Sequence, residues 1–160
     1  MTARIHYTKA PGILDAMLNL QKYLGQTGIE ENLLNLMSLR ASQINGCAYC
    51  LDMHWKDLRA AGESEQKLAM LEAWREAPGF SDRERAALAW TEAVTLVTEG
   101  HVPDAVYNLA REQFSETDLA NLTLAVVAIN GWNRLNVAFR TEAGSYQPPK
   151  KQQTAGTSSH

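Results

Sequence analysis

Apolar residues recur at every third or fourth position along most of the chain, which is the spacing that places them on one face of an α-helix. Pro11 suits the first turn of a helix. The apolar stripe that follows it consists of Ile13, Met17, Leu20 and Leu24. No segment shows the alternation of apolar and polar residues that is typical of a half-buried strand. The pattern therefore predicts an all-α fold.

Glycine, proline and capping residues divide this pattern into seven or eight short helices, which predicts a helical bundle. The expected helices cover residues 11–24, 29–44, 47–61, 64–74, 81–100, 103–111, 116–129 and 132–139. Ser81 and Glu84 have the spacing of a capping box, so a long helix with an inward stripe ending at Val97 is expected to begin there. Asn130 and Gly131 are expected to kink or break the last helical segment.

The last part of the chain differs from the rest in composition. Residues 144–160 are polar, small and rich in proline, with almost nothing to bury, so we expect a tail without fixed structure. Residues 1–143 are expected to form one helical domain, because 160 residues in all fit a single domain with a sizeable core.

Composition and charge narrow the class of protein. The net charge is −3 and the only basic block is Lys150-Lys151, so nucleic acid is not expected as a partner. No apolar run reaches the ~18 residues of a membrane span, and the first residues lack the order of a signal peptide. Two cysteines do not make the framework of a secreted protein, and a cytoplasmic location is therefore expected.

Both cysteines lie in one short stretch, residues 43–54, with the spacing C-x-x-C and a histidine after the second. Asn45-Gly46 favours a break before a new helix, which places Cys47 in the first turn of that helix. Cys47, Cys50 and His54 then lie at i, i+3 and i+7, on one helix face. Free N–H groups and the positive end of the helix dipole favour a thiolate there.

Three interpretations of this group are open from spacing alone. The first is a redox pair, in which one thiolate attacks an oxidised substrate, the other forms the disulfide, and His54 takes a proton. The second is a zinc site, for which a fourth ligand is missing because His6 and His101 have no motif around them. The third is that two buried cysteines and a histidine simply pack in the core.

Residues 39–54 resemble the signature of the alkylhydroperoxidase AhpD-like proteins, within the wider carboxymuconolactone decarboxylase superfamily. The resemblance continues through residues 84–93 and 128–139 and covers roughly residues 5–143. It implies an all-α, homo-oligomeric protein, often a trimer or hexamer, that reduces peroxides through the C-x-x-C pair. By position, Cys50 matches the peroxide-attacking cysteine, Cys47 the more exposed resolving cysteine, and His54 the histidine of a proton relay.

The sequence departs from the best-known mycobacterial-type AhpD proteins at two positions. Tyr49 stands where they have histidine, and Asn35, twelve residues before the first cysteine, stands where they have glutamate. Asparagine can orient a water or an imidazole but cannot accept a proton as a base, so the relay is shortened or rerouted. Glu92 and Glu31 are the candidates for the missing carboxylate. Glu92 is favoured because it lies within a resembling segment.

The residues around the motif are expected to have structural roles. Arg40 precedes the motif and is expected to be solvated or salt-bridged, and Trp132-Asn133-Arg134 is expected to pack within the bundle. Tyr49 is expected to cover the thiols.

The expected function is a thiol-dependent peroxidase that reduces alkyl or hydrogen peroxides through Cys47 and Cys50, assisted by His54 and Glu92. It requires a thiol reductant or redox partner protein, a homo-oligomer of three or six subunits is expected, and no metal, haem, flavin or membrane is involved. Two alternatives stay open: a carboxymuconolactone decarboxylase-like enzyme that does not use the thiols, and a non-enzymatic thiol redox sensor.

Overall fold

A computed structural model describes residues 2–149; residue 1 and residues 150–160 lie outside the description. Within 2–149 the chain forms seven α-helices and two short 3-10 turns and no β-strand, which confirms the all-α prediction. The elements are η1 (Tyr7–Lys9), α1 (Ile13–Leu24), α2 (Glu31–Asn45), α3 (Ala48–Ala60), α4 (Glu65–Ala69), η2 (Leu71–Ala73), α5 (Asp82–Thr95), α6 (Asp104–Gln113) and α7 (Glu116–Phe139). None of these helices is long and apolar enough to cross a membrane.

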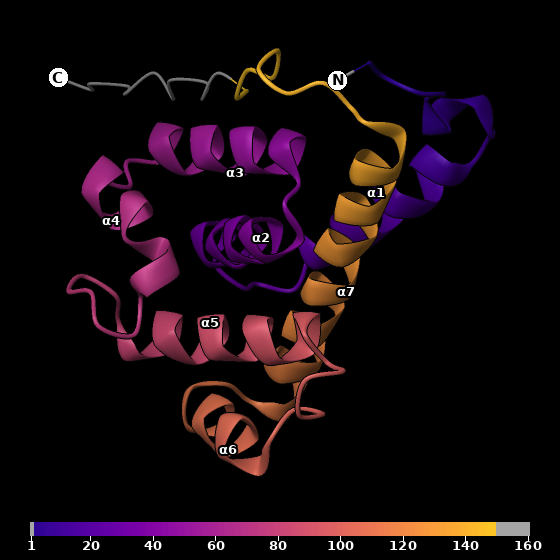
Figure 1. Ribbon diagram of the computed structural model, residues 1–160. Coiled ribbons are helices and arrows are strands. Elements are labelled where there is room, and N and C mark those ends of the chain that lie inside the picture. Colours follow the sequence, from indigo (N-terminus) through magenta and orange to yellow (C-terminus); the bar gives the residue numbers. More distant parts are fainter. Residues whose placement is uncertain (1, 150–160) are drawn as a thin grey trace, which may run out of the picture.

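Helix α2 lies at the centre of the bundle. Figure 1 shows it end on, with α3, α4, α5 and α7 around it, and it packs most extensively against α3, α5 and α7. Its sequence explains this position, because buried apolar residues point to more than one side: Leu33 and Met37 join one core cluster, and Leu36 and Leu39 join another. A helix that is apolar on several sides is stable only when neighbours cover all of them.

Local signals in the sequence set several helix boundaries as expected. The Ser81 side chain accepts a hydrogen bond from the Glu84 N–H while the Glu84 carboxylate accepts one from the Ser81 N–H, which confirms the capping box. The Ser115 side chain accepts the Asp118 N–H at the start of α7. Gly46 ends α2 with a φ of 67°, a left-handed conformation that glycine adopts without strain.

Two of the expected helices are shorter than predicted. Helix α5 ends at Thr95 rather than at Gly100, and Val97 is 48% exposed, so its place in an inward stripe was wrong. Helical spacing continues past Thr95 in the sequence, but residues 96–100 form turns, and residues 97–100 are exposed. The segment 64–74 is divided into α4 and the 3-10 turn η2 instead of forming one helix.

The expected interruption of the last helix is absent, because α7 continues through Asn130 and Gly131 to Phe139. The Asn130 side chain donates to the Val126 carbonyl within the helix and to Thr95 on α5, so this residue tightens the helix and ties it to a neighbour. Gly131 lies where α1 crosses α7, and a side chain there would meet the Met17 Cε atom at 3.1 Å. Glycine therefore serves the packing of two helices rather than a break.

The first residues of the expected tail pack on α3. The Gly144 N–H donates to Asp52, and Lys56 donates to the Gly144 and Tyr146 carbonyls. The Tyr146 hydroxyl donates to Asp57 at 2.7 Å. The prediction of a segment without fixed structure therefore does not describe residues 144–146, and for residues 150–160 it lies outside the described part of the chain.

Candidate functional site

Cys47 stands between the end of α2 and the start of α3. Gly46 turns the chain, and the Cys47 N–H donates to the Ser42 carbonyl at 3.1 Å, which fixes the entry into the new helix. Cys47 has an extended backbone and is the N-cap of α3, with its Sγ accepting the N–H of Cys50 at 3.4 Å. The sequence motif therefore places one sulfur at the positive end of a helix, as expected.

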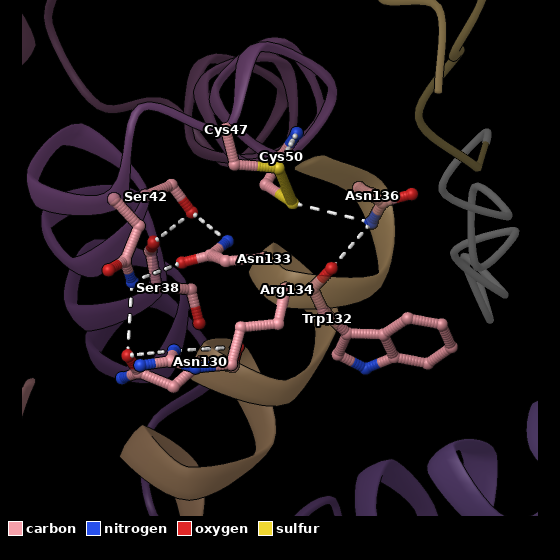
Figure 2. Close-up of a disulfide and its surroundings, with 10 residues drawn as sticks. Ser38, Ser42, Cys47, Cys50, Asn130, Trp132, Asn133, Arg134 and Asn136 are labelled. Carbon is pink, nitrogen blue, oxygen red and sulfur yellow. Dashed lines mark hydrogen bonds between the residues drawn. A yellow bond between two sulfur atoms is a disulfide. The ribbon is translucent and has the colours of Figure 1, made fainter. Parts of the chain in front are cut away.

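Cys47 and Cys50 form a disulfide within the first turn of α3, with their Cα atoms 5.4 Å apart (Figure 2). Each cysteine is only 1% exposed. They share an apolar cluster with Ala41 of α2 and Ile129 of α7, and Tyr49 and Trp132 pack against it. Tyr49 covers the sulfurs in this way, which is the role expected of it.

Cys47 is no more exposed than Cys50, at 1% each, so the expectation of a more exposed Cys47 is wrong, although a cavity lies beside this residue. A surface cavity of about 380 Å³ lies between the start of α3 and the end of α7. Its wall includes Cys47, Tyr49, Asn136 and Arg140, but not Cys50. A small thiol in this cavity would meet Cys47 first.

Three buried or partly buried asparagines of α7 face the cysteine motif. Asn133 donates to Ser42 Oγ at 3.0 Å and accepts from Asn45 at 2.9 Å. Asn136 donates from Nδ2 to Cys50 Sγ at 3.5 Å and to the Trp132 carbonyl at 3.0 Å (Figure 2).

Sequence reasoning assigned only packing to this part of α7 and missed Asn136. The signal was present, since asparagines stand at positions 130, 133 and 136 of an otherwise largely apolar helix. Buried polar groups at this spacing share one helix face and require partners, so they indicate a polar contact across the helix interface.

His54 lies one turn after Cys50 on α3 and is partly buried. Its Nδ1 is 3.1 Å from Asn35 Oδ1, so the imidazole contacts the residue that stands in place of the expected glutamate. With that oxygen as acceptor, Nδ1 carries the proton and Nε2 keeps its lone pair. Burial lowers the pKa of His54 to about 4, so the ring is neutral at physiological pH. Within residues 2–149, no hydrogen bond joins His54 to either sulfur.

Glu92 on α5 is held by three donors rather than by His54. Arg40 and Trp74 each donate to Oε1 at 2.8 Å, and Arg75 lies 2.7 Å from Oε2. Burial alone would raise the pKa of Glu92, but the hydrogen bonds from Trp74, Arg75 and Arg40 outweigh it and hold the pKa below the ordinary value. Arg40 is salt-bridged, as expected. Glu92 joins α2, the α4–α5 segment and α5 to one another.

The other candidate carboxylate, Glu31, lies at a second cavity of about 360 Å³ between α2 and α3. Asn35, Asp57 and Tyr146 line it as well, so Asn35 connects this cavity to the His54 ring. Residues 2–149 contain no group of three or more His, Cys, Asp or Glu side chains arranged to hold a metal ion.

Comparisons with known proteins match this architecture. The chain is 39% identical to the uncharacterised protein YdfG of Bacillus subtilis over 91% of the chain and 99% of the relative. A solved structure from Agrobacterium tumefaciens, of a protein of unknown function whose description proposes an antioxidant defence protein AhpD, is 40% identical with a TM-score of 0.86, covering 91% of this chain and 100% of that one.

A shorter segment of the chain is similar to a named enzyme. Alkyl hydroperoxide reductase AhpD of Bradyrhizobium diazoefficiens is 40% identical over 45 residues, which is 28% of this chain and 25% of that protein. The sequence profile of the carboxymuconolactone decarboxylase family matches residues 11–93. These matches confirm the resemblance to AhpD-like proteins that the motif indicated, and the chain belongs to the carboxymuconolactone decarboxylase family.

Proposed function

We propose that this protein is a dithiol peroxidase that reduces alkyl or hydrogen peroxides. The observation that carries the proposal is the Cys47–Cys50 pair, whose sulfurs are in bonding contact at a helix N-terminus with a cavity beside Cys47. A buried pair of this kind closes to a disulfide with little movement. The likeness of one segment to alkyl hydroperoxide reductase AhpD supports the choice of peroxide as substrate.

The proposed cycle begins with a Cys50 thiolate. Its sulfur attacks one peroxide oxygen, the O–O bond breaks, and an alcohol or water leaves, so Cys50 becomes a sulfenic acid. The Cys47 thiolate then attacks the Cys50 sulfur, which forms the disulfide and releases water. A thiol reductant attacks Cys47 Sγ, displaces the Cys50 thiolate, and a second reductant thiol frees Cys47.

His54 is the proposed base of this cycle. Its lone pair at Nε2 is free because Nδ1 is engaged with Asn35, and its lowered pKa keeps it unprotonated at neutral pH. The ring follows Cys50 by one helical turn, and we propose that it takes the thiol proton through a water. Asn35 orients the imidazole in place of the glutamate of related proteins and accepts no proton.

For Glu92 we propose a supporting role in the same site. The carboxylate holds Arg40 and Trp74 against α2, the helix whose end presents Cys47. Its three donors and lowered pKa make it a weak proton acceptor, so its contribution is to position α2 rather than to take the proton from His54.

The proposed cycle indicates the reductant, and the exposed apolar side chains indicate contacts between subunits. Each turnover consumes two reducing thiols, which the cytosol supplies, so we place the protein there with a small thiol or a redox protein as reductant. Several large apolar side chains are exposed on α1 and α7, among them Leu14, Leu18, Tyr23 and Val127. We propose that they contribute to a homo-oligomer of three or six subunits, which light scattering measures directly.

The experiment is a thiol count combined with peroxide turnover. Wild-type protein is expected to show two free thiols after reduction and none after one equivalent of cumene hydroperoxide, with steady consumption when dithiothreitol is present. Cys47→Ser is expected to stop at a Cys50 sulfenic acid that dimedone traps. Cys50→Ser is expected to consume no peroxide.

Two other results would contradict the peroxidase. Full turnover in both single variants would favour the thiol-independent enzyme of the same family. Stoichiometric disulfide formation without turnover under excess dithiothreitol would favour a redox sensor. Thermal melts of both variants serve as the control, because a folded variant is required before lost turnover is read as lost chemistry.

A further inference from the structure

Cys50 faces a conflict between its surroundings and its proposed chemistry. Its side chain is buried in an apolar cluster, and burial of that kind raises the pKa of a thiol and disfavours the thiolate. Cys47 differs, because its Sγ caps α3 and accepts a backbone N–H. The helix terminus therefore supports a thiolate at Cys47 and leaves Cys50 in need of another donor.

The side chain of Asn136 supplies that donor from across the helix interface. Its Nδ2 lies 3.5 Å from Cys50 Sγ, within the range of a hydrogen bond to sulfur, and within residues 2–149 it is the side chain that donates to this atom. Asn136 is 4% exposed, so water does not weaken the contact. Figure 2 shows the amide nitrogen turned toward the sulfur and the amide oxygen turned away.

The orientation of this amide is fixed by a second contact. Nδ2 also donates to the Trp132 carbonyl at 3.0 Å, one turn earlier in α7. A flipped amide would place an oxygen against that carbonyl and against Cys50 Sγ, two acceptors that cannot pair with it. The same orientation leaves Asn136 Oδ1 buried without a hydrogen-bond partner in the described structure, which costs free energy. The fold keeps this arrangement despite the unpaired oxygen, and the arrangement directs the Asn136 N–H at the Cys50 sulfur.

We infer that Asn136 is a catalytic residue whose N–H stabilises the Cys50 thiolate, both when this sulfur attacks a peroxide and when it leaves the disulfide. The role in attack on a peroxide rests on the proposed dithiol cycle. The role in departure from the disulfide rests on disulfide chemistry alone. In the second step a reductant thiolate bonds to Cys47 Sγ, the S–S bond breaks, and its electron pair goes to Cys50. A hydrogen bond to the departing sulfur lowers the pKa of the leaving thiol and speeds its departure.

The position of the cavity beside Cys47 agrees with these separate roles of Cys47, which the reductant attacks, and Cys50, which departs. It reaches Cys47, where the reductant enters, and its wall includes Asn136, which stands behind the sulfur that departs. The titratable side chains that line the cavity with Cys47 are Tyr49, Arg140 and Glu142. His54 follows Cys50 by one turn of α3, and α2 contributes the uncharged Ala41 and Ser42.

The test measures the thiol pKa directly, without peroxide. In a Cys47→Ser background, thiolate absorbance near 240 nm is followed with pH, and Asn136→Ala is expected to raise the Cys50 pKa by roughly half to one unit, the effect of one neutral hydrogen bond. Asn136→Asp is expected to raise it further, because a carboxylate opposes the thiolate. In the otherwise native chain, Asn136→Ala is expected to slow reduction of the disulfide by dithiothreitol about two- to fivefold.

The matched control is Asn133→Ala, one turn earlier on α7. Asn133 is also a buried amide of α7, but it hydrogen-bonds to Ser42 and Asn45 and not to a sulfur. The Asn133→Ala variant is expected to destabilise the fold while leaving the Cys50 pKa unchanged. An unchanged Cys50 pKa in folded Asn136→Ala, or an equal shift in Asn133→Ala, would overturn the inference. Absence of peroxide turnover in the wild type would remove the peroxidase proposal and leave the pKa result standing.

Discussion

At the scale of single residues, the site depends on groups whose charge is controlled by burial. His54 is kept neutral because burial lowers its pKa and because its partner Asn35 is an uncharged amide. A glutamate at position 35 would attract a proton to the imidazole, whereas asparagine does not. Asparagine in place of the expected glutamate therefore leaves the His54 ring unprotonated over a wide pH range.

The buried imidazole makes the stability of the fold depend on pH. The pKa of His54 is about 4 in the folded protein and near 6.5 when exposed, so below pH 6.5 the unfolded chain binds a proton that the folded chain does not. The free energy of unfolding is therefore expected to fall, by roughly 2 kcal/mol from this group between pH 7 and pH 4.5. His54→Gln is expected to lose that part of the pH dependence in urea unfolding.

The control for this prediction is His101→Gln, because His101 is exposed. It is expected to keep the wild-type dependence on pH. If the free energy of unfolding changed with pH in the same way for wild type and His54→Gln, this result would contradict a buried, neutral His54.

At the scale of elements, the sequence predicted a helix boundary well where the signal for it lies within one helical turn. The Ser81–Glu84 capping box and the Gly46 turn depend on residues within one turn of each other, and both formed as expected. The end of α5 depends on what packs over residues 96–100, and apolar spacing up to Val97 contains no information about that cover. The spacing of the α7 asparagines indicated a polar contact, but not its partner, because Cys50 lies 86 positions from Asn136.

The crossing of α1 and α7 gives a prediction at this scale. Alanine at position 131 favours a helix by about 1 kcal/mol over glycine, but its Cβ would meet Met17 Cε at 3.1 Å. In a Met17→Ala background, Gly131→Ala is therefore expected to raise the free energy of unfolding by about 1 kcal/mol. In the wild-type background the gain is expected to be smaller, because the Met17 side chain must move.

Urea unfolding of the four proteins in this cycle gives the coupling between the two positions. Equal gains in both backgrounds would show that Met17 does not restrict position 131. A large loss of the free energy of unfolding in both backgrounds would show that α7 needs glycine at position 131 for another contact.

At the scale of the whole molecule, the chain closes over the face of α3 that lies away from the core. Residues 144–146 bond to Asp52 and Lys56, and Tyr146 reaches Asp57 at the cavity that Asn35 lines. The composition of the last residues did not reveal this contact, because a single tyrosine among polar residues carries no periodic signal. The all-α class, the C-x-x-C position and the family were readable because each rests on a long or specific pattern.

The Tyr146–Asp57 contact is expected to stabilise the fold in a pH-dependent way. Burial raises the pKa of Asp57, and the hydrogen bond from Tyr146 opposes that rise by favouring the carboxylate. Tyr146→Phe removes the donor, so it is expected to cost about 1 kcal/mol at pH 7 and less near pH 4, where the protonated acid does not need it. Thermal melts at the two pH values measure the difference.

Tyr23→Phe is the matched control, because the Tyr23 hydroxyl donates to the uncharged amide of Asn121. Its cost is expected to be the same at both pH values. A pH-independent cost for Tyr146→Phe would show that Asp57 is not the partner that matters.

The bridge between Cys47 and Cys50 spans a sequence separation of only 3. Opening so small a ring releases little chain entropy, because the gain grows with the logarithm of loop length. The chain-entropy relation gives roughly 2 kcal/mol for a loop of this size, so the reduced form is expected to be only that much less stable than the oxidised form. Under the proposed cycle, over-oxidation of Cys50 rather than unfolding is therefore expected to limit the number of turnovers that each copy completes.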